Sequence, residues 1–135
     1  MRKWGIKMSS LNAKSDRIVL IIKCSVKTDA SEIQRWTKDR ASKYVFDLKE
    51  EKGISYEWFI SEDNSEATIV ETYVDSDGLL QRLANHMASP IAEEVLEQVD
   101  ITGVFVYGNA KRDLIDALSG WGAKFQRHHC GFTHM

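Results

Sequence analysis

RIVLIIKCSVK, the sequence of residues 17–27, predicts the central strand of the fold. Its β-branched and apolar side chains are typical of a strand that is covered on at least one face. A helix is expected next, because Thr28 or Asp29 offers an N-cap and Glu32 stands three residues after Asp29, as a capping box requires. Apolar side chains then recur at three- and four-residue steps through residues 30–49. The regular part of the chain therefore begins with a strand and one long helix.

Two further strands follow, and the residues between them favour a turn. Residues 54–61 (ISYEWFIS) alternate two sets of side chains, and each set includes an aromatic residue, so neither face of this strand is simply exposed to water. Asp63-Asn64-Ser65 supply turn chemistry before a strand that we place within residues 66–75. A β-hairpin is the expected result.

Pro90 is the single proline of the chain and divides the next helical region into two. Apolar side chains recur at helical spacing through residues 76–87, and Ser89-Pro90 restarts the pattern as N-cap and first helical residue. A fourth strand is expected at residues 101–108, followed by a brief helix that Gly120 ends.

In chain order these elements are β-α-β-β-α(α)-β, the split β-α-β arrangement of a ferredoxin-like fold. We expect an α+β protein with a four-stranded antiparallel sheet and its helices on one face. The domain would span residues 17–108, with residues 1–16 as a flexible N-terminal arm and residues 109–135 as a C-terminal helix and tail packing on the domain. Apolar side chains on both strand faces indicate that the helix-free face is covered, and a second copy of the same sheet is the economical cover.

Composition excludes several classes of function. The 135 residues suffice for one core, and 18 basic against 20 acidic side chains leave a net charge of −2, without the positive field that nucleic-acid binding needs. No apolar run approaches the roughly 20 residues of a membrane helix. Cys24 and Cys130 are too few and too far apart for a disulfide scaffold. We expect a cytoplasmic protein that binds neither nucleic acid nor membrane.

Two short motifs carry a resemblance to a known family. Glu71-x-Tyr73-x-Asp75 leads out of the third expected strand, and HMASP at residues 86–90 lies where the helical region breaks. With these motifs, residues 56–108 resemble the antibiotic-biosynthesis-monooxygenase-like families of the dimeric α/β barrel superfamily. The resemblance implies a homodimer in which two ferredoxin-like subunits stack sheet against sheet into one closed barrel. It also implies a pocket between the helices and the sheet of each subunit.

Two titratable side chains are candidates for catalysis. His86 has an imidazole with an ordinary pKa of about 6.5, which suits a base or hydrogen-bond partner for a phenolic substrate, or a helix-end residue that bonds the last carbonyls. Glu71 is flanked by Ile69 and Tyr73 on one strand face, so it is expected to be partly buried with a raised pKa. It would then act as an acid or orient a substrate hydroxyl, or pair structurally with Arg40 or another cation of the first helix.

Aromatic side chains are candidates for substrate binding. Tyr56, Trp58 and Tyr73 could line a flat pocket for a planar ligand, or could belong to the plain core. Near the C-terminus, Trp121, Phe125 and Phe132 could fold the tail back over the sheet or pocket as a lid. The tail also contains four side chains of the kinds that bind zinc or copper, at a spacing that matches no established site. These are His128, His129, Cys130 and His134.

Two functions are compatible with these residues. In the first, the protein resembles the cofactor-free oxygenases of these families, which act on polycyclic phenols or quinols. His86, with Glu71, would deprotonate or orient a small aromatic or quinol substrate, whose anion would itself reduce dioxygen. No Rossmann glycine fingerprint, P-loop, nucleophile elbow or HExxH motif indicates a cofactor, so we expect neither metal nor cofactor. In the second, the same fold is a non-catalytic homodimeric small-molecule-binding protein.

Overall fold

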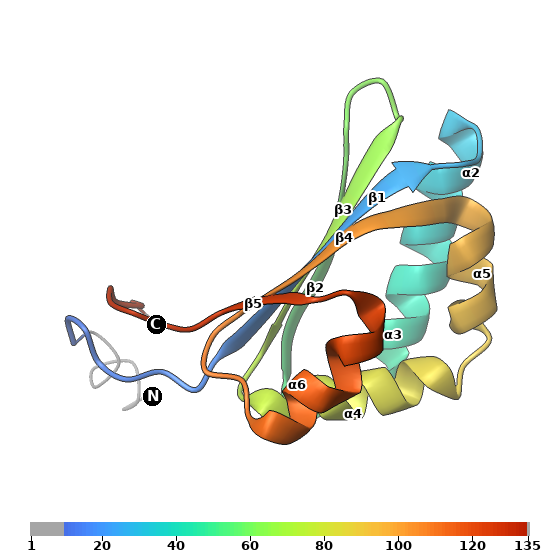
Figure 1. Ribbon diagram of the computed structural model, residues 1–135. Coiled ribbons are helices and arrows are strands. Elements are labelled where there is room, and N and C mark those ends of the chain that lie inside the picture. The colour runs from blue at the N-terminus through green and yellow to red at the C-terminus, as the bar shows by residue number, and fades with distance from the viewer. Residues whose placement is uncertain (1–9, 135) are drawn as a thin grey trace.

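A sheet with helices on one of its faces makes up the fold, as Figure 1 shows. The computed structural model describes residues 10–134, so residues 1–9 of the expected N-terminal arm lie outside the described part of the chain. The strands are β1 (Ile18–Val26), β2 (Gly53–Ile60), β3 (Glu66–Tyr73), β4 (Val99–Tyr107) and β5 (Lys124–Gln126). The helices are α2 (Ala30–Arg35), η1 (Trp36–Ala41), α3 (Ser42–Leu48), α4 (Ser76–Met87), α5 (Ile91–Gln98), α6 (Arg112–Leu118) and η2 (Ser119–Trp121).

The ferredoxin-like arrangement is confirmed, but the expected four-stranded antiparallel sheet is wrong at one edge. The strand order is β2-β3-β1-β4-β5, and β1 to β4 pair antiparallel. β5 adds a fifth strand that runs parallel to β4, with Phe105 opposite Lys124 and Tyr107 opposite Gln126. A parallel neighbour needs a crossover, and α6 with η2 supplies it between the two strands. The sheet is therefore mixed, and part of the C-terminal segment belongs to it.

The first helical region is continuous from α2 to α3 but contains a π-helical turn. Asp29 caps it as predicted, since its carboxylate accepts a hydrogen bond from the Glu32 backbone N–H at 2.9 Å. Within η1 the backbone N–H of Ser42 bonds the carbonyl of Thr37, five residues back, where an α-helix would bond four back. The region ends at Lys49, whose φ of 51° is left-handed.

The break between α4 and α5 lies at Pro90, one residue away from the predicted arrangement. Pro90 occupies the N-cap position of α5, and helical structure begins at Ile91. Ser89 does not cap α5, because its hydroxyl donates backwards to the carbonyl of His86 at 2.8 Å and so closes the end of α4. The break therefore turns the chain immediately after His86.

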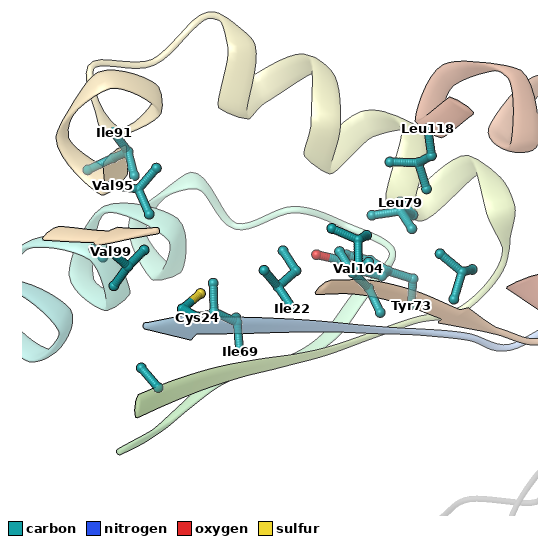
Figure 2. Close-up of a cluster of buried hydrophobic side chains, with 14 of the residues drawn as sticks. Ile22, Cys24, Ile69, Tyr73, Leu79, Ile91, Val95, Val99, Val104 and Leu118 are labelled. Carbon is teal, nitrogen blue, oxygen red and sulfur yellow. The ribbon is translucent and has the colours of Figure 1, made fainter. Parts of the chain in front are cut away.

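The core lies between the inner face of the sheet and the helices (Figure 2). Alternate side chains of β1 and β3 point to this face, as the two-residue period of a strand requires. Helical side chains meet them from α4, α5 and α6, and ten of the residues in contact are labelled in Figure 2. They are Ile22, Cys24, Ile69, Tyr73, Leu79, Ile91, Val95, Val99, Val104 and Leu118.

The opposite face of the sheet has an apolar patch at its centre and is covered by no helix or strand among residues 10–134 (Figure 1). Ile21 lies at its centre, with Val70 of β3 and Phe105 of β4 as its cross-strand partners. Phe59 of β2 is 54% exposed on the same face, opposite Thr68.

In this described part of the chain no helix has the length and apolar character needed to cross a membrane.

Candidate functional site

A cavity of about 60 Å³ lies between the inner face of the sheet and the helices. By volume it holds roughly four water molecules, at about 15 Å³ each. Its wall is mostly aliphatic and aromatic, and its polar and aromatic groups come from η1, β2, β3, α4 and η2. Those used below are Trp36, Tyr56, Trp58, Glu71, Arg82, His86 and Trp121.

Four of the five predicted site residues line this cavity, and the fifth touches one of them. Tyr56 and Trp58 project from β2, Glu71 from β3 and His86 from α4. Tyr73 does not line the cavity, but its hydroxyl donates a short hydrogen bond to Oε1 of Glu71. Since Tyr56 is directly opposite Glu71 across the β2–β3 ladder, the strand register itself brings these side chains together.

Glu71 is 5% exposed and is the buried carboxyl of the cavity. Burial raises its pKa from 4.5 to about 7, against the opposing effects of the Tyr73 hydroxyl and the positive charge of Arg82. The predicted alternative of a structural pair with Arg40 is wrong, because Arg40 forms two hydrogen bonds of 2.9 and 2.7 Å with Glu94. Glu71 can therefore exchange a proton near neutral pH.

His86 is half-buried near the end of α4, with its ring centroid 6.4 Å from that of Trp121. Burial, and secondarily the charge of Arg82, lowers the pKa of its imidazole, which favours the neutral ring at pH 7. Within residues 10–134 the imidazole has no hydrogen-bond partner, and the carbonyl at the end of α4 is bonded by Ser89 instead. The predicted helix-end role is thus taken by a serine, and the ring is available to a ligand.

Aromatic side chains hold each other in place along one wall. The indole N–H of Trp58 donates to the hydroxyl of Tyr56 at 3.0 Å, and the rings of Trp36 and Trp58 meet edge to face at 5.8 Å. Trp36 is fixed in turn by Glu94, which accepts its indole N–H at 2.9 Å and whose pKa falls to about 2 beside Arg40 and Trp36. Burial raises the pKa of the Tyr56 hydroxyl, so it stays protonated.

Sequence reasoning missed two charged residues of the site, Arg82 and Glu50. The Arg82 side chain is 5% exposed, and its Nη1 lies 3.1 Å from Oε2 of Glu50. Oε2 of Glu50 also accepts a hydrogen bond from Asn85 at 2.8 Å. One signal could have found Arg82, because it stands four residues before His86 and three after Leu79, on the helix face that enters the cavity.

The C-terminal segment meets the cavity only in part. Trp121 and Leu118 line it, and Phe125 of β5 packs against the core. Phe132 is 61% exposed and contacts the ring of His134, so it does not cover the pocket as expected for a lid. In the described part of the chain, the tail included, no three His, Cys, Asp or Glu side chains are grouped so that they could hold a metal ion.

Several solved structures share this fold. MupZ from Pseudomonas fluorescens gives a TM-score of 0.71 over 90% of this chain and 91% of MupZ, at 16% sequence identity. SnoaB, a cofactor-independent oxygenase from Streptomyces nogalater, gives 0.56 over 73% of this chain and 96% of its own, at 15% identity. Protein SO0527 from Shewanella oneidensis gives 0.52 over 73% of this chain and 93% of its own, at 22% identity. No protein-family model and no curated protein matches the sequence.

At these identities the similarity shows the fold alone. It supports the ferredoxin-like architecture that the motifs around Glu71 and His86 imply. Residues 1–108 make up less than 90% of the chain, so the match to MupZ extends into residues 109–135. The fold shared with MupZ therefore includes part of the C-terminal segment.

Proposed function

We propose that this protein is a homodimeric, cofactor-independent monooxygenase-like enzyme that acts on a small aromatic or quinol compound. The observation that carries the proposal is the position of Glu71, a buried carboxyl with a pKa of about 7 on the wall of an aromatic cavity. A base with a pKa near the working pH is the most effective one for proton abstraction. The neutral imidazole of His86 on the same wall supplies a second acceptor or a donor to the substrate.

The proposed reaction needs no redox partner. Glu71 takes a proton from the substrate, and the electron-rich anion that remains forms a carbon–oxygen bond with dioxygen. For a substrate with an activated CH₂ group the overall change is R₂CH₂ + O₂ → R₂C=O + H₂O. The four electrons that reduce dioxygen come from the substrate, and the proton held by Glu71 leaves in the water. The apolar wall formed by Trp36, Trp58 and their neighbours favours this chemistry because it excludes water from the anion.

The size of the cavity bears on the substrate. An apolar cavity of roughly 150 Å³ accommodates one benzene ring, whereas this cavity measures about 60 Å³. An aromatic substrate therefore has to displace part of the wall. Trp121 is the candidate for that movement, because it is 38% exposed and lies on the short turn between α6 and β5.

The uncovered sheet face supports the homodimer. Val70 and Phe105 flank Ile21 there on the two neighbouring strands, and Phe59 of β2 is half-exposed on the same face. An apolar patch on an uncovered sheet face is a candidate interaction surface. Stacking two such faces would bury them and would close the two sheets into a barrel.

Oxygen consumption by purified protein tests the enzymatic proposal. A panel of phenols and quinols that bind would be assayed with the wild type, Glu71→Gln, His86→Ala and the double variant. Loss of the base is expected to lower the rate by roughly 10²–10⁴-fold. The matched control is Glu93→Gln, which changes an exposed carboxylate of α5 and should leave the rate unchanged. Ligand binding without oxygen consumption in the wild type would instead establish the non-catalytic binding function.

A further inference from the structure

One donor in the cavity wall is left without an acceptor. Arg82 is 4% exposed, and its Nη1 makes no hydrogen bond with any described residue although Oε2 of Glu50 is 3.1 Å away. The distance suffices for an ion pair, but the geometry does not align the N–H group with the carboxylate. A buried guanidinium is always charged and is costly to leave unsatisfied, so an orphaned N–H group at a cavity requires an explanation.

We propose that Arg82 is the anion-binding residue of the cavity: its Nη1–H group receives the ionised oxygen of a phenol or enol. The ligand is thus an apolar molecule with one acidic hydroxyl. The choice of ligand in this inference rests on the proposed function. The inference adds Arg82 as the residue that selects this ligand. A planar guanidinium suits an oxyanion because it donates in a fixed direction.

The charges around Arg82 favour a ligand that arrives with its proton. Glu50 faces it from the segment before β2, Glu71 and Tyr73 from β3, Tyr56 from β2 and His86 from its own helix. Arg82 and Glu50 already compensate each other. If the ligand O–H bond breaks and the proton moves to the Glu71 carboxylate, the ligand anion faces Arg82 while Glu71 becomes neutral. No net charge is then brought into the cavity.

The test uses 4-nitrophenol, whose phenol and phenolate forms have different absorption spectra, and nitrobenzene, which lacks the hydroxyl. With the wild type, the pKa of bound 4-nitrophenol is expected to lie at least about one unit below its pKa in water. Arg82→Gln should weaken 4-nitrophenol binding at pH 8 roughly tenfold or more and should abolish this lowering of the pKa. Nitrobenzene affinity should stay within about twofold. Arg35→Gln, an exposed arginine of α2, is the matched control.

Glu50→Gln distinguishes anion binding from a merely structural role of Arg82. It removes the carboxylate that competes for the guanidinium, so it should tighten 4-nitrophenol binding while Arg82→Gln weakens it. If both variants weaken binding equally, Arg82 serves only to pair with Glu50 and the inference is overturned. The double variant, Glu50→Gln with Arg82→Gln, removes both charges together and, with circular dichroism, shows whether a loss reflects unfolding.

The outcomes separate this inference from the proposed function, because the binding assay involves no turnover. A wild type that binds the phenolate but never consumes oxygen would contradict the monooxygenase and retain the role of Arg82. If the wild type consumes oxygen but leaves the pKa of bound 4-nitrophenol unchanged, the monooxygenase proposal is retained and the role of Arg82 is contradicted. Failure of the wild type to bind 4-nitrophenol overturns the inference.

Discussion

The pH dependence of stability offers a direct measure of how strongly the protein desolvates Glu71. Its pKa is 4.5 in an unfolded chain and about 7 in the folded protein. A folded-state pKa above the unfolded one means that the group contributes stability at low pH and loses it as the pH rises from about 4.5 through 7. At about 1.4 kcal/mol per pKa unit, the loss is about 3 kcal/mol.

Glu71→Gln should remove this dependence, because glutamine is neutral at every pH and can still accept the Tyr73 hydroxyl. Near pH 4 the two proteins should unfold with nearly equal free energies. By pH 8 the glutamine variant should be the more stable by about 3 kcal/mol. His86 contributes with the opposite sign, since burial lowers its pKa and stability rises as it loses its proton. Its contribution cancels in the difference between the two proteins.

Urea unfolding at pH 4, 5, 6, 7 and 8, at one fixed protein concentration, is the assay. Glu93→Gln, an exposed carboxylate, should differ from the wild type by the same small amount at every pH. If the curves of Glu71→Gln and the wild type run parallel from pH 4 to pH 8, Glu71 ionises as freely as in water. The reasoning from its burial, and with it the proposed base, would then be refuted.

Three further predictions concern other parts of the molecule. If the proposed dimer forms through the uncovered sheet face, Ile21→Glu should give a monomer in light scattering where the wild type gives a dimer, with circular dichroism unchanged; a variant that is still dimeric would show that another surface mediates association. Gly108→Ala should lower the unfolding free energy by about 2–3 kcal/mol in urea, because φ is 126° and the new methyl group would overlap the Arg17 carbonyl, and a change near zero would refute the steric argument. Trp121→Ala should speed the association of 4-nitrophenol in stopped flow, and an unchanged rate would show that this ring does not limit access.

The element order was predictable because each of the longer elements carries its own period. The β-branched and apolar run of residues 17–27 predicted a covered strand, which the burial of Ile18, Leu20 and Ile22 confirms, and Asp29 caps the first helix as its spacing predicts. β5 was not predictable, since three residues are too few to show alternation. Its place depends on α6, which carries the chain back to the edge of β4.

The site residues that lie on one strand or within one motif were predictable from the sequence. Glu71 and Tyr73 share a strand face by their spacing, and their contact follows from it. Glu50 could not be predicted, because it lies between α3 and β2 and reaches Arg82 only through tertiary packing. Arg82 stands one helical turn before His86, so its position indicated that it faces the cavity. Arginine side chains on helices are ordinarily exposed to solvent, so its residue type gave no sign of burial.

The π-helical turn in the first helical region determines which of its side chains face the sheet and the cavity. Four of its five buried residues, Ile33, Thr37, Ala41 and Val45, follow one another at steps of four, and Trp36 is buried beside Thr37. A regular α-helix advances about 400° in four residues, so such a stripe would drift by about 40° per step around the axis. The wider turn absorbs much of that drift and keeps the stripe facing the sheet. A regular α-helix would need one residue fewer between Ile33 and Val45 to present the same face to the sheet, because eleven residues advance about 1,100°, close to three whole turns.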